Sequence, residues 1–545
     1  MTRDLARLAT GTFDLLVVGG GIYGLTIAAD AAQRGLSVAL VEREDFGSGT
    51  SFNHLRTIHG GLRYLQTLDL ERARESILER RTLARIAPHA LRPLPFVLPL
   101  TSRLVRGPLM MRAGLLVDAF VARDRNTRVA DTLHLPSGRV LSAEEARSRY
   151  PAIDRPDLRG AAVWYDYVTV EADRLTLAWA LLASAHGAQL ANHAEAAALR
   201  IEGARVTGAQ VRDRITGATV EVRARLVVNA TGAGVDTLLP PDARTGTPLI
   251  RVMNLVTRLE AGDAALGGQA ASGRALFMVP WRGRALFGTF ESSAFCRADD
   301  ADPAGEEIDR FLAEVASAFP RFGLTRADVT LVHRGVVPAR AGRGGLPTLE
   351  GHQRVRDHAN GPRAVEGLIS IAGTKYTTAR SVAEQIVDRV LVKIGRPATP
   401  SQTAGTPLTG TDQPIAAATP QAESLAPFPP DVRRHLEAAY GPAAPLIATL
   451  ASEQPAFAAR LAPDQPVIGA QIAWAVRHEM AVTLADAVIR RTPLGAVGHP
   501  GPAALAAAAE LMAVERRWTV EERAREVERV DAFYALAGGP LAPRA

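Results

Sequence analysis

The sequence FDLLVVGGGIYGLTIAADAAQRGLSVALVE, residues 13–42, is typical of a strand–turn–helix–strand unit. Residues 13–18 form an apolar run that predicts a buried parallel strand. The run leads into a G-x-G-x-x-G motif, which is followed by a segment of helical composition at 25–34 and a second strand at 37–41. Because these parts occur in this order, the stretch favours a Rossmann-like unit over an ordinary glycine-rich turn.

The residues of this unit that would hold a dinucleotide follow from what each position requires. Gly19 permits a tight turn, Gly21 lets the backbone approach a pyrophosphate, and Gly24 lets the helix pack closely on the strand. The helix N-terminus offers N–H groups and a positive dipole to the phosphates. Glu42, at the end of the second strand, can accept hydrogen bonds from an adenosine ribose. We therefore predict dinucleotide binding.

Composition sets the broad class of the protein. The chain has 545 residues, 47% of them hydrophobic, which is enough for two or three domains. Its net charge of +6 suits an anionic substrate or an anionic membrane surface. No dense Lys/Arg block interleaves with aromatic residues, so we expect no nucleic-acid partner. Cys296 is the single cysteine, so neither a disulfide framework nor a cysteine metal site is expected, and a reducing, cytoplasmic setting fits.

Two features bear on membrane contact. The N-terminal residues carry charges and no apolar signal region, and no apolar run approaches the ~18 residues that a spanning helix needs. Residues 109–121, however, are apolar on most faces. This segment is either a helix packed on the body of the protein or a helix that docks on a membrane surface. The sequence leaves both interpretations open.

The middle of the chain predicts two sheets. An alternating pattern at 205–224, followed by N-A-T-G at 229–232, predicts a meander whose last strand rejoins the dinucleotide sheet. Residues 249–337 predict a second, mostly antiparallel region with a hairpin turn near 281–284. A buried strand at 368–372 leads to a second strand-to-helix junction.

The remaining segments predict helices. Residues 70–87 are expected to form an exposed, charge-rich helix. Residues 396–414 are rich in Pro, Thr and Gly, and we place a domain boundary there, with an all-helical region beyond it. Thr519 and Glu522 have the spacing of a capping box. One apolar helical stripe is expected at Ile472, Val476, Met480, Leu484 and Val488.

At this point the motifs resemble the family of FAD-dependent glycerol-3-phosphate dehydrogenases and oxidases. The resemblance appears along the whole chain, including R-H-E-M-A and R-R-T in the helical region. Its main elements are G-G-G-I-x-G at 19–24, I-H-G-G-L-R-Y at 58–64, N-A-T-G at 229–232, P-W at 280–281 and K-x-T-T-x-R at 375–380.

The resemblance implies FAD as cofactor, a peripheral membrane location and the oxidation of a secondary alcohol. It places Arg63, Tyr64 and Lys375 toward the substrate. Along the cofactor it places Gly19, Gly21, Gly24, Glu42, Thr50, Ser51, Ala230, Gly232, Gly373, Lys375 and Thr377.

The chemistry of alcohol oxidation adds roles for several of these side chains. Hydride transfer to a flavin requires a base for the hydroxyl proton, and His59 and Lys375 are the candidates. Each has a structural alternative, since His59 could hold its loop and Lys375 could pair with a carboxylate. A cation near flavin N1 would stabilise the reduced ring, and Lys375 or Arg56 could supply it. Arg63 would either grip an anionic substrate group or pair with a carboxylate.

The chain departs from the family pattern where the family holds substrate phosphate. Val337 stands in G-V-V-P where the family has an arginine, and Gln353 falls at the position of a second site arginine. Arg334, Arg340 and Arg343 lie near the lost arginine in sequence and could replace it. These departures open the choice of substrate while leaving the FAD scaffold intact.

We therefore predict an α/β flavoprotein with a Rossmann-like FAD-binding domain, an interleaved antiparallel-sheet substrate domain and an all-helical C-terminal domain. The FAD-dependent oxidoreductase region is expected at 1–400 and the helical domain at 401–545. Within the former, FAD-binding segments are expected near 10–90, 160–245 and 345–395, and substrate-domain segments near 91–159 and 246–344.

The expected activity is hydride transfer from a CH–OH carbon of sn-glycerol 3-phosphate or a related polyol to flavin N5, with electrons passing to a quinone or oxygen. One alternative is a divergent flavin oxidase or dehydrogenase acting on a non-phosphorylated or amine substrate. Another is a non-catalytic flavin-binding redox sensor. No metal is expected; a homodimer and peripheral contact with the inner face of a membrane are possible.

Overall fold

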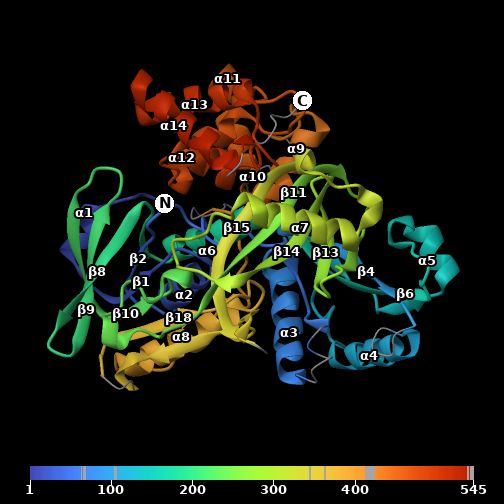
Figure 1. The fold of residues 1–545 in the computed structure, drawn as a ribbon. Helices are drawn as coiled ribbons and strands as arrows, with labels where there is room; N and C mark the ends of the chain where they lie inside the picture. The colour runs from blue at the N-terminus through green and yellow to red at the C-terminus, as the bar shows by residue number, and fades with distance from the viewer. Residues whose placement is uncertain are drawn as a thin grey trace.

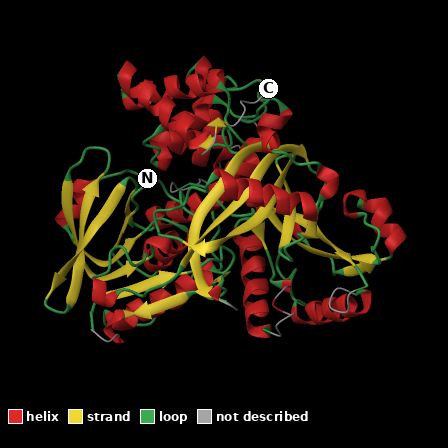
Figure 2. Ribbon diagram, in the orientation of Figure 1, coloured by secondary structure: helices red, strands yellow, loops and turns green. Residues whose placement is uncertain are grey.

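A computed structural model describes residues 1–62, 64, 69–102, 107–342, 345–360, 364–411, 424–536 and 539–540. It has two sheets side by side with a helical domain above them (Figure 1). Helices alternate along the chain with the strands that form the first sheet. The region around the second sheet consists mostly of strands (Figure 2). The predicted combination of a Rossmann-like domain, an antiparallel domain and a helical domain is confirmed.

The first sheet is built on the predicted stretch. β1 pairs in parallel with β2 and β10, β2 with β7, and β10 with β18, while β17 adds an antiparallel edge. The β8–β9–β10 meander extends it, as predicted. The bounds are β1 (Thr12–Val18), β2 (Val38–Val41), β7 (Gln189–Ala191), β8 (Ala194–Glu202), β9 (Arg205–Asp213), β10 (Thr219–Asn229), β17 (Arg354–Asp357) and β18 (Leu368–Ala372).

Helix α2 (Ile22–Gln33) follows β1 and packs against both α6 (Ala172–Ala185) and α8 (Ala379–Lys393). Every residue of β2 and β18 is buried, as expected for parallel strands covered on both faces. One apolar core joins these helices to the sheet. The carboxyl ends of β1, β2, β10 and β18 consequently meet at one edge, where a ligand site is expected.

The second sheet is mostly antiparallel, with one parallel pair between β4 and β12. Helix α7 (Gly305–Ala318) shares an apolar core with β11, β13 and β14, and therefore covers one face. The bounds are β3 (Thr57–Ile58), β4 (Leu91–Leu100), β5 (Arg139–Leu141), β6 (Gly160–Thr169), β11 (Leu249–Glu260), β12 (Ala265–Gln269), β13 (Ala275–Trp281), β14 (Arg284–Phe295), β15 (Val329–Ala341) and β16 (Pro347–Leu349). The predicted hairpin is present as β13 and β14. Strand β6 pairs with β4 in this sheet, although it lies in a segment that we assigned to FAD binding.

The last part of the chain is helical apart from a short ladder of β19 (Ala535–Leu536) and β20 (Gly539–Pro540). The capping box at Thr519 is confirmed. The predicted single stripe is wrong, because α12 ends at Met480, whose φ of 58° is left-handed, and a π-helix follows. The helical elements are α9 (Pro430–Tyr440), α10 (Ala444–Ala451), α11 (Pro455–Ala458), α12 (Gly469–Glu479), the π-helix Asp486–Arg491, α13 (Pro502–Arg516) and α14 (Val520–Tyr534).

Two further helices differ from expectation. Helix α3 (Leu70–Ile86) is charge-rich but not exposed, because Glu79 and Arg80 are buried and paired with residues of other elements. Helix α4 (Pro108–Val121) is poorly packed on the body of the protein, since Leu115 is the one buried residue that it contributes. The remaining α-helices are α1 (Leu5–Thr10) and α5 (Ala143–Arg149).

Candidate functional site

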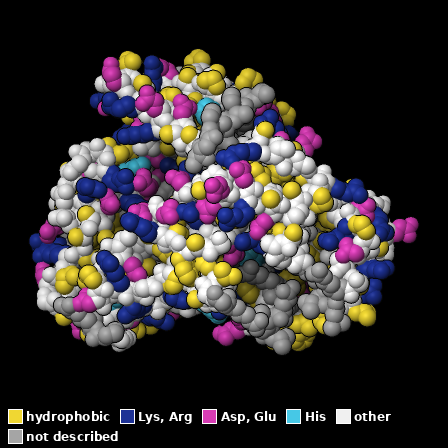
Figure 3. Space-filling view, in the orientation of Figure 1, with side chains coloured by type: hydrophobic (Ala, Val, Ile, Leu, Met, Phe, Trp, Pro, Cys, Tyr) yellow, Lys and Arg dark blue, Asp and Glu magenta, His cyan; other side chains and the backbone are white. Residues whose placement is uncertain are grey.

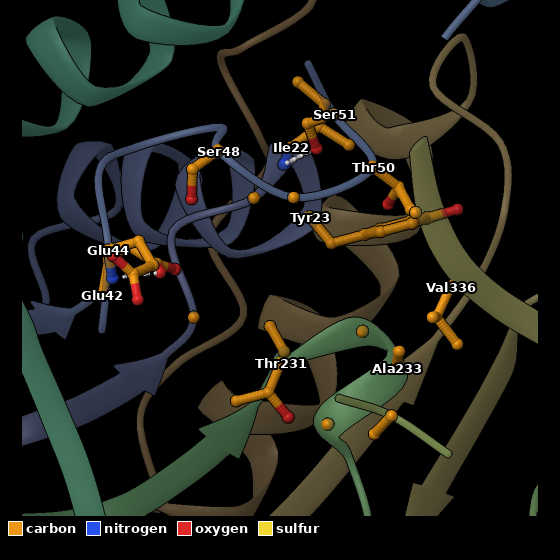
Figure 4. Close-up of a pocket in the computed structure, with 18 of the residues that line it drawn as sticks. Ile22, Tyr23, Glu42, Glu44, Ser48, Thr50, Ser51, Thr231, Ala233 and Val336 are labelled. Carbon is orange, nitrogen blue, oxygen red and sulfur yellow. Dashed lines mark hydrogen bonds between the residues drawn. The ribbon is translucent and has the colours of Figure 1, made fainter. Parts of the chain in front are cut away.

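A cleft of about 440 Å³ runs along the edge where the strands of the first sheet end (Figure 4). One wall is the glycine turn after β1 together with the loop that follows β2. The opposite wall includes Thr231 and Ala233 after β10, and Val336 of β15 in the second sheet. The site therefore lies between the two sheets, and its lining includes both Glu42 and Lys375.

The glycine turn has no room for side chains at Gly19, Gly20 and Gly24. A Cβ at Gly24 would lie 1.8 Å from the carbonyl oxygen of Gly19, because helix and strand touch there. A Cβ at Gly19, whose φ is +106°, would lie 2.6 Å from the carbonyl oxygen of Ala230. At Gly21 the nearest atom would be the Ser51 hydroxyl oxygen, 3.3 Å away. The tight turn predicted at Gly19 and the close packing predicted at Gly24 therefore match the geometry.

Ser51 and Glu42 fix the loop that follows β2 against this turn. The hydroxyl of Ser51 accepts a hydrogen bond from the N–H of Ile22 at 2.9 Å, at the start of α2. The carboxylate of Glu42 accepts from the N–H groups of Gly20 and Glu44, at 2.6 and 2.8 Å. Burial raises the pKa of Glu42, although these two hydrogen bonds oppose the shift. Both side chains line the cleft, as predicted.

The cleft lining includes a cation, Lys375, that lies above the ring of Tyr64, a residue outside the lining. The Nζ of Lys375 lies 4.5 Å from the centroid of Tyr64, and its carbonyl accepts a hydrogen bond of 3.0 Å from the hydroxyl of Tyr23. A Cβ at Gly373 would lie 2.6 Å from that same hydroxyl, so the junction after β18 needs glycine there. The predicted residues Tyr64 and Lys375 are thus brought together from distant parts of the sequence.

Arg56 lies in a buried layer and is not among the residues that line the cleft. Its guanidinium stacks over Trp281 at 4.5 Å and over Phe52 at 5.0 Å. It also contacts the carboxylate of Asp173 and the Nε2 of His333, each at 3.4 Å. Burial lowers the pKa of His333 well below its ordinary value, and the charge of Arg56 adds to the shift. In this structure Arg56 therefore organises the layer behind the cleft, and its predicted contact with the cofactor stays a prediction.

A second buried cluster joins the loop after β2 to the C-terminal domain. Asp45 receives a bidentate contact from Arg491, at 2.6 and 2.7 Å, and a contact from Arg490 at 2.7 Å. Asp486 pairs with Arg490 and with His193, whose Nε2 is 2.9 Å away. The side chains of Asp45, His193 and Asp486 have the spacing of metal ligands, but arginines already neutralise both carboxylates. We therefore interpret the cluster as structural.

The cleft also receives a residue from the C-terminal domain. Phe533 of α14 lines it, and the guanidinium of Arg334 lies 5.3 Å from the Phe533 ring. Arg334 also pairs with Asp302, so its charge is already engaged. No sequence motif pointed to Phe533, because the contact between α14 and β15 depends on how the domains dock.

Comparisons with known proteins agree with this geometry. A sequence profile described as "FAD dependent oxidoreductase" matches residues 14–389. A second profile, described as "C-terminal domain of alpha-glycerophosphate oxidase", matches residues 401–523. The chain is 32% identical to a glycerol-3-phosphate dehydrogenase of Synechocystis sp., over 97% of this chain and 98% of that protein.

The chain belongs to the FAD-dependent glycerol-3-phosphate dehydrogenase family. It is also 33% identical to a glycerol-3-phosphate dehydrogenase of Mycobacterium leprae, over 96% of this chain and 88% of that protein. The crystal structure of a glycerol-3-phosphate dehydrogenase from Bacillus halodurans complexed with FAD superposes with a TM-score of 0.73. That structure is 25% identical and covers 99% of this chain and 98% of its own. The cofactor of the present protein is accordingly FAD.

The residues present fit FAD. The turn between β1 and α2 brings glycine backbone to the cleft wall, and the cleft lining includes the carboxylate of Glu42 and the basic side chain of Lys375. The cleft lining includes the predicted residues Gly19, Gly21, Glu42, Thr50, Ser51, Ala230, Gly232, Gly373 and Lys375.

Several residues that were predicted to contact the cofactor or the substrate do not line the cleft. Gly24 acts one layer behind through packing, and Thr377 is buried beside the cleft. His59 precedes Gly60, whose N–H donates to Asp166 at 2.7 Å, and His59 is not among the residues that line the cleft. Arg63 lies outside the described residues. The roles of these residues at the cofactor or substrate stay predictions.

Proposed function

We propose that this protein oxidises the secondary hydroxyl of sn-glycerol 3-phosphate and passes the electrons to a quinone or to oxygen. Full-length similarity to glycerol-3-phosphate dehydrogenases supports the substrate. The observation that carries the proposal is Lys375, a cation in the cleft lining that lies above the ring of Tyr64. A cation in the cleft suits both an anionic substrate and charge that develops on a reduced ring.

When bound, FAD supplies a ring that accepts a hydride from the CH–OH carbon. The protein must then orient the alcohol, exclude water and take the hydroxyl proton. Lys375 is held over an aromatic face, which favours its ammonium form, so we assign it the electrostatic role. His59 is left as the proposed acceptor of the proton. The buried layer around Arg56 excludes water from behind the site.

A second candidate is a related oxidase or dehydrogenase whose substrate lacks phosphate. Val337 favours it, because this side chain is buried in an apolar cluster with Ile250 and Ala339 at the cleft wall. Arg334, which could have replaced the family arginine, is engaged by Asp302. Among the described residues, Arg354 is likewise paired, with Glu350.

Anaerobic bleaching of the bound flavin tests both candidates. Purified holoprotein is mixed with sn-glycerol 3-phosphate, with free polyols and with amines, and the flavin absorbance is followed. Rapid bleaching by the phosphate ester supports the first proposal, and selective bleaching by an uncharged polyol or an amine supports the second. V337R should strengthen binding of glycerol 3-phosphate if phosphate approaches Val337. A flavin that no compound in the panel bleaches would contradict both and favour the redox sensor.

We further propose that α4 attaches the protein peripherally to a membrane. Its apolar residues lie at helical spacing and are strongly exposed: Leu109 is 78%, Met110 52%, Leu116 73%, Val117 44% and Phe120 71% exposed. The helix lies at the end of the molecule away from the C-terminal domain (Figure 1), and hydrophobic side chains gather at that lower edge of the surface (Figure 3). Among the described residues no helix is long and apolar enough to cross a bilayer. An amphipathic helix lying in the interface fits these facts.

Sedimentation with anionic lipid vesicles tests this attachment. The double variant L116E/F120E should lose vesicle binding, because two buried carboxylates at the interface are costly. V514E places the same charge at an exposed apolar residue of α13 and serves as the control. If both proteins sediment alike, the assignment is wrong. If the wild-type protein instead forms a dimer that the double variant lacks, α4 covers a second copy of the chain.

A further inference from the structure

Phe533 brings the C-terminal domain to the cofactor cleft. Among the residues of that domain that the structure describes, it is the one that lines the cleft. Its side chain is only half-buried, so part of this apolar ring remains open while the cleft holds no ligand. A molecule bound in the cleft can therefore bury it.

Three parts of the molecule meet at Phe533. In the loop after β2, the ring of Phe52 lies 6.3 Å away in an edge-to-face arrangement. In β15, the guanidinium of Arg334 lies 5.3 Å from the Phe533 ring. Loop and strand are joined to each other, because the backbone N–H of Arg334 donates to the Oδ1 of Asn53 at 3.0 Å. We call this meeting point of Phe52, Asn53, Arg334 and Phe533 the three-domain corner.

The three-domain corner borders residues of the FAD site. A Cβ at Gly335 would lie 2.7 Å from the Cγ2 of Thr50, so β15 and the loop after β2 touch beside Arg334. Both residues line the cleft together with Asn53 and Arg334. The same loop carries Ser51, whose hydroxyl accepts from the N–H of Ile22 at the start of α2. The corner is therefore tied to the turn that approaches the pyrophosphate.

Helix α14 holds the ring of Phe533 in a fixed place. The next residue, Tyr534, is 3% exposed, and its hydroxyl donates to the carbonyl oxygen of Gly495 at 2.6 Å. Val530, one turn earlier, is fully buried in the core of the C-terminal domain. The position of Phe533 at the cleft consequently depends on the docking of the whole domain, and not on a loose chain end.

We infer that Phe533 packs against bound FAD, so that the C-terminal domain forms part of the cofactor site. Burial of the open part of an aromatic ring stabilises the complex. Because this contact exists only when the domain is docked, FAD binding and domain docking stabilise each other. The inference depends on the cofactor and not on the proposed substrate, and it goes beyond the proposed function.

The rate at which holoprotein loses FAD tests the contact. The flavin released on dilution is collected by ultrafiltration and measured by its absorbance, with no substrate present. We expect F533A to lose FAD about 10-fold faster than the wild type, because it lacks the apolar ring. F533Y keeps the ring and should retain FAD nearly as well as the wild type. F295A removes a phenylalanine that is 45% exposed at the end of β14, outside the cleft lining, and serves as the matched control.

Equal rates of FAD loss in F533A and the wild type would overturn the inference. So would equally fast loss in F533A and F295A, because the effect would then not belong to the cleft. Loss from F533Y as fast as from F533A would also contradict a role for the ring.

Hydrogen exchange separates a contact with FAD from a role in packing alone. In the wild type, FAD should slow amide exchange at residues 526–534 of α14 relative to protein from which the flavin has been removed. In F533A this effect of FAD on α14 should disappear, while FAD still slows exchange at the glycine turn, residues 19–24. If FAD leaves exchange in α14 of the wild type unchanged, Phe533 supports only the packing of the domain and the inference is wrong.

Discussion

At the scale of single residues, the glycine turn shows how a backbone contact sets a requirement for sequence. The 1.8 Å separation between a Cβ at Gly24 and the oxygen of Gly19 leaves no room for a methyl group. We expect G24A to move α2 away from β1 and to abolish FAD retention. Flavin absorbance of the purified variant measures this. Gly35 lies at the end of the same helix and has open space around it. Its φ of +79° makes alanine strained there, but the G35A variant should keep FAD.

Lys375 is the residue whose charge the proposed chemistry needs. We expect K375M to reduce the rate of flavin reduction by glycerol 3-phosphate about 100-fold, a typical loss for a group acting in the transition state. K375R keeps a permanent cation and should retain much more of the rate. Stopped-flow absorbance under anaerobic conditions measures both. Equal collapse of the two variants would show that Lys375 transfers the proton itself.

The residue scale also shows what sequence reasoning can reach. The positions of the glycines, Glu42 and Ser51 in the site were predictable, because each residue belongs to one local sequence motif. Phe533 was not predicted as a site residue, because it comes from a helix far away in sequence.

At the scale of elements, α3 illustrates why a charged helix need not be exposed. Arg380 of α8 makes a two-point contact with Glu79 of α3, including a hydrogen bond of 2.8 Å, and both side chains are buried. The polar composition of α3 predicted a face exposed to solvent, but the buried charges of α3 pair with residues of other elements. Periodicity alone carries no information about such partners. The same limit explains the wrong stripe after Met480, where a left-handed residue ends α12.

The pair between α3 and α8 yields a prediction for stability. Removing one partner from a buried pair costs about 3–5 kcal/mol when the other charge is left uncompensated. Arg380 keeps a second, more exposed partner in Glu384 at 2.8 Å, so E79Q should lower the free energy of unfolding by up to that amount, measured by denaturant titration. E195Q, which removes a partner from the more exposed pair with Arg212, should cost less than about 1 kcal/mol. Similar losses in the two variants would contradict the assignment.

At the scale of the whole molecule, the fold class, the two sheets and the helical end follow from the order of motifs along the chain. How the helical domain docks does not, because it depends on buried charges that are far apart in sequence. Asp45 is separated from the neighbouring residues Arg490 and Arg491 by more than 440 residues, yet the three meet in one buried cluster. Their pairing fixes the loop after β2 to the C-terminal domain.

This cluster predicts a pH dependence of stability. Burial alone would lower the pKa of His193, but Asp486 outweighs it and raises the pKa above the ordinary value. The stabilisation is therefore complete below about pH 6.5, the pKa of an unfolded histidine, and is lost as pH rises through the raised value. The melting temperature should fall from pH 6 to pH 9, and H193Q should flatten this trend. An unchanged trend in H193Q would contradict the prediction.

The bond between Asp45 and Arg491 has a consequence for biosynthesis. Asp45 lies in the loop after β2, and Arg491, which neutralises it, is synthesised 446 residues later. Until then the nascent chain holds a carboxylate that must stay in water, so the loop bearing it cannot settle. We expect the chain to acquire its flavin only after residue 491 has been synthesised, and a ribosome-bound fragment ending before residue 486 to remain colourless.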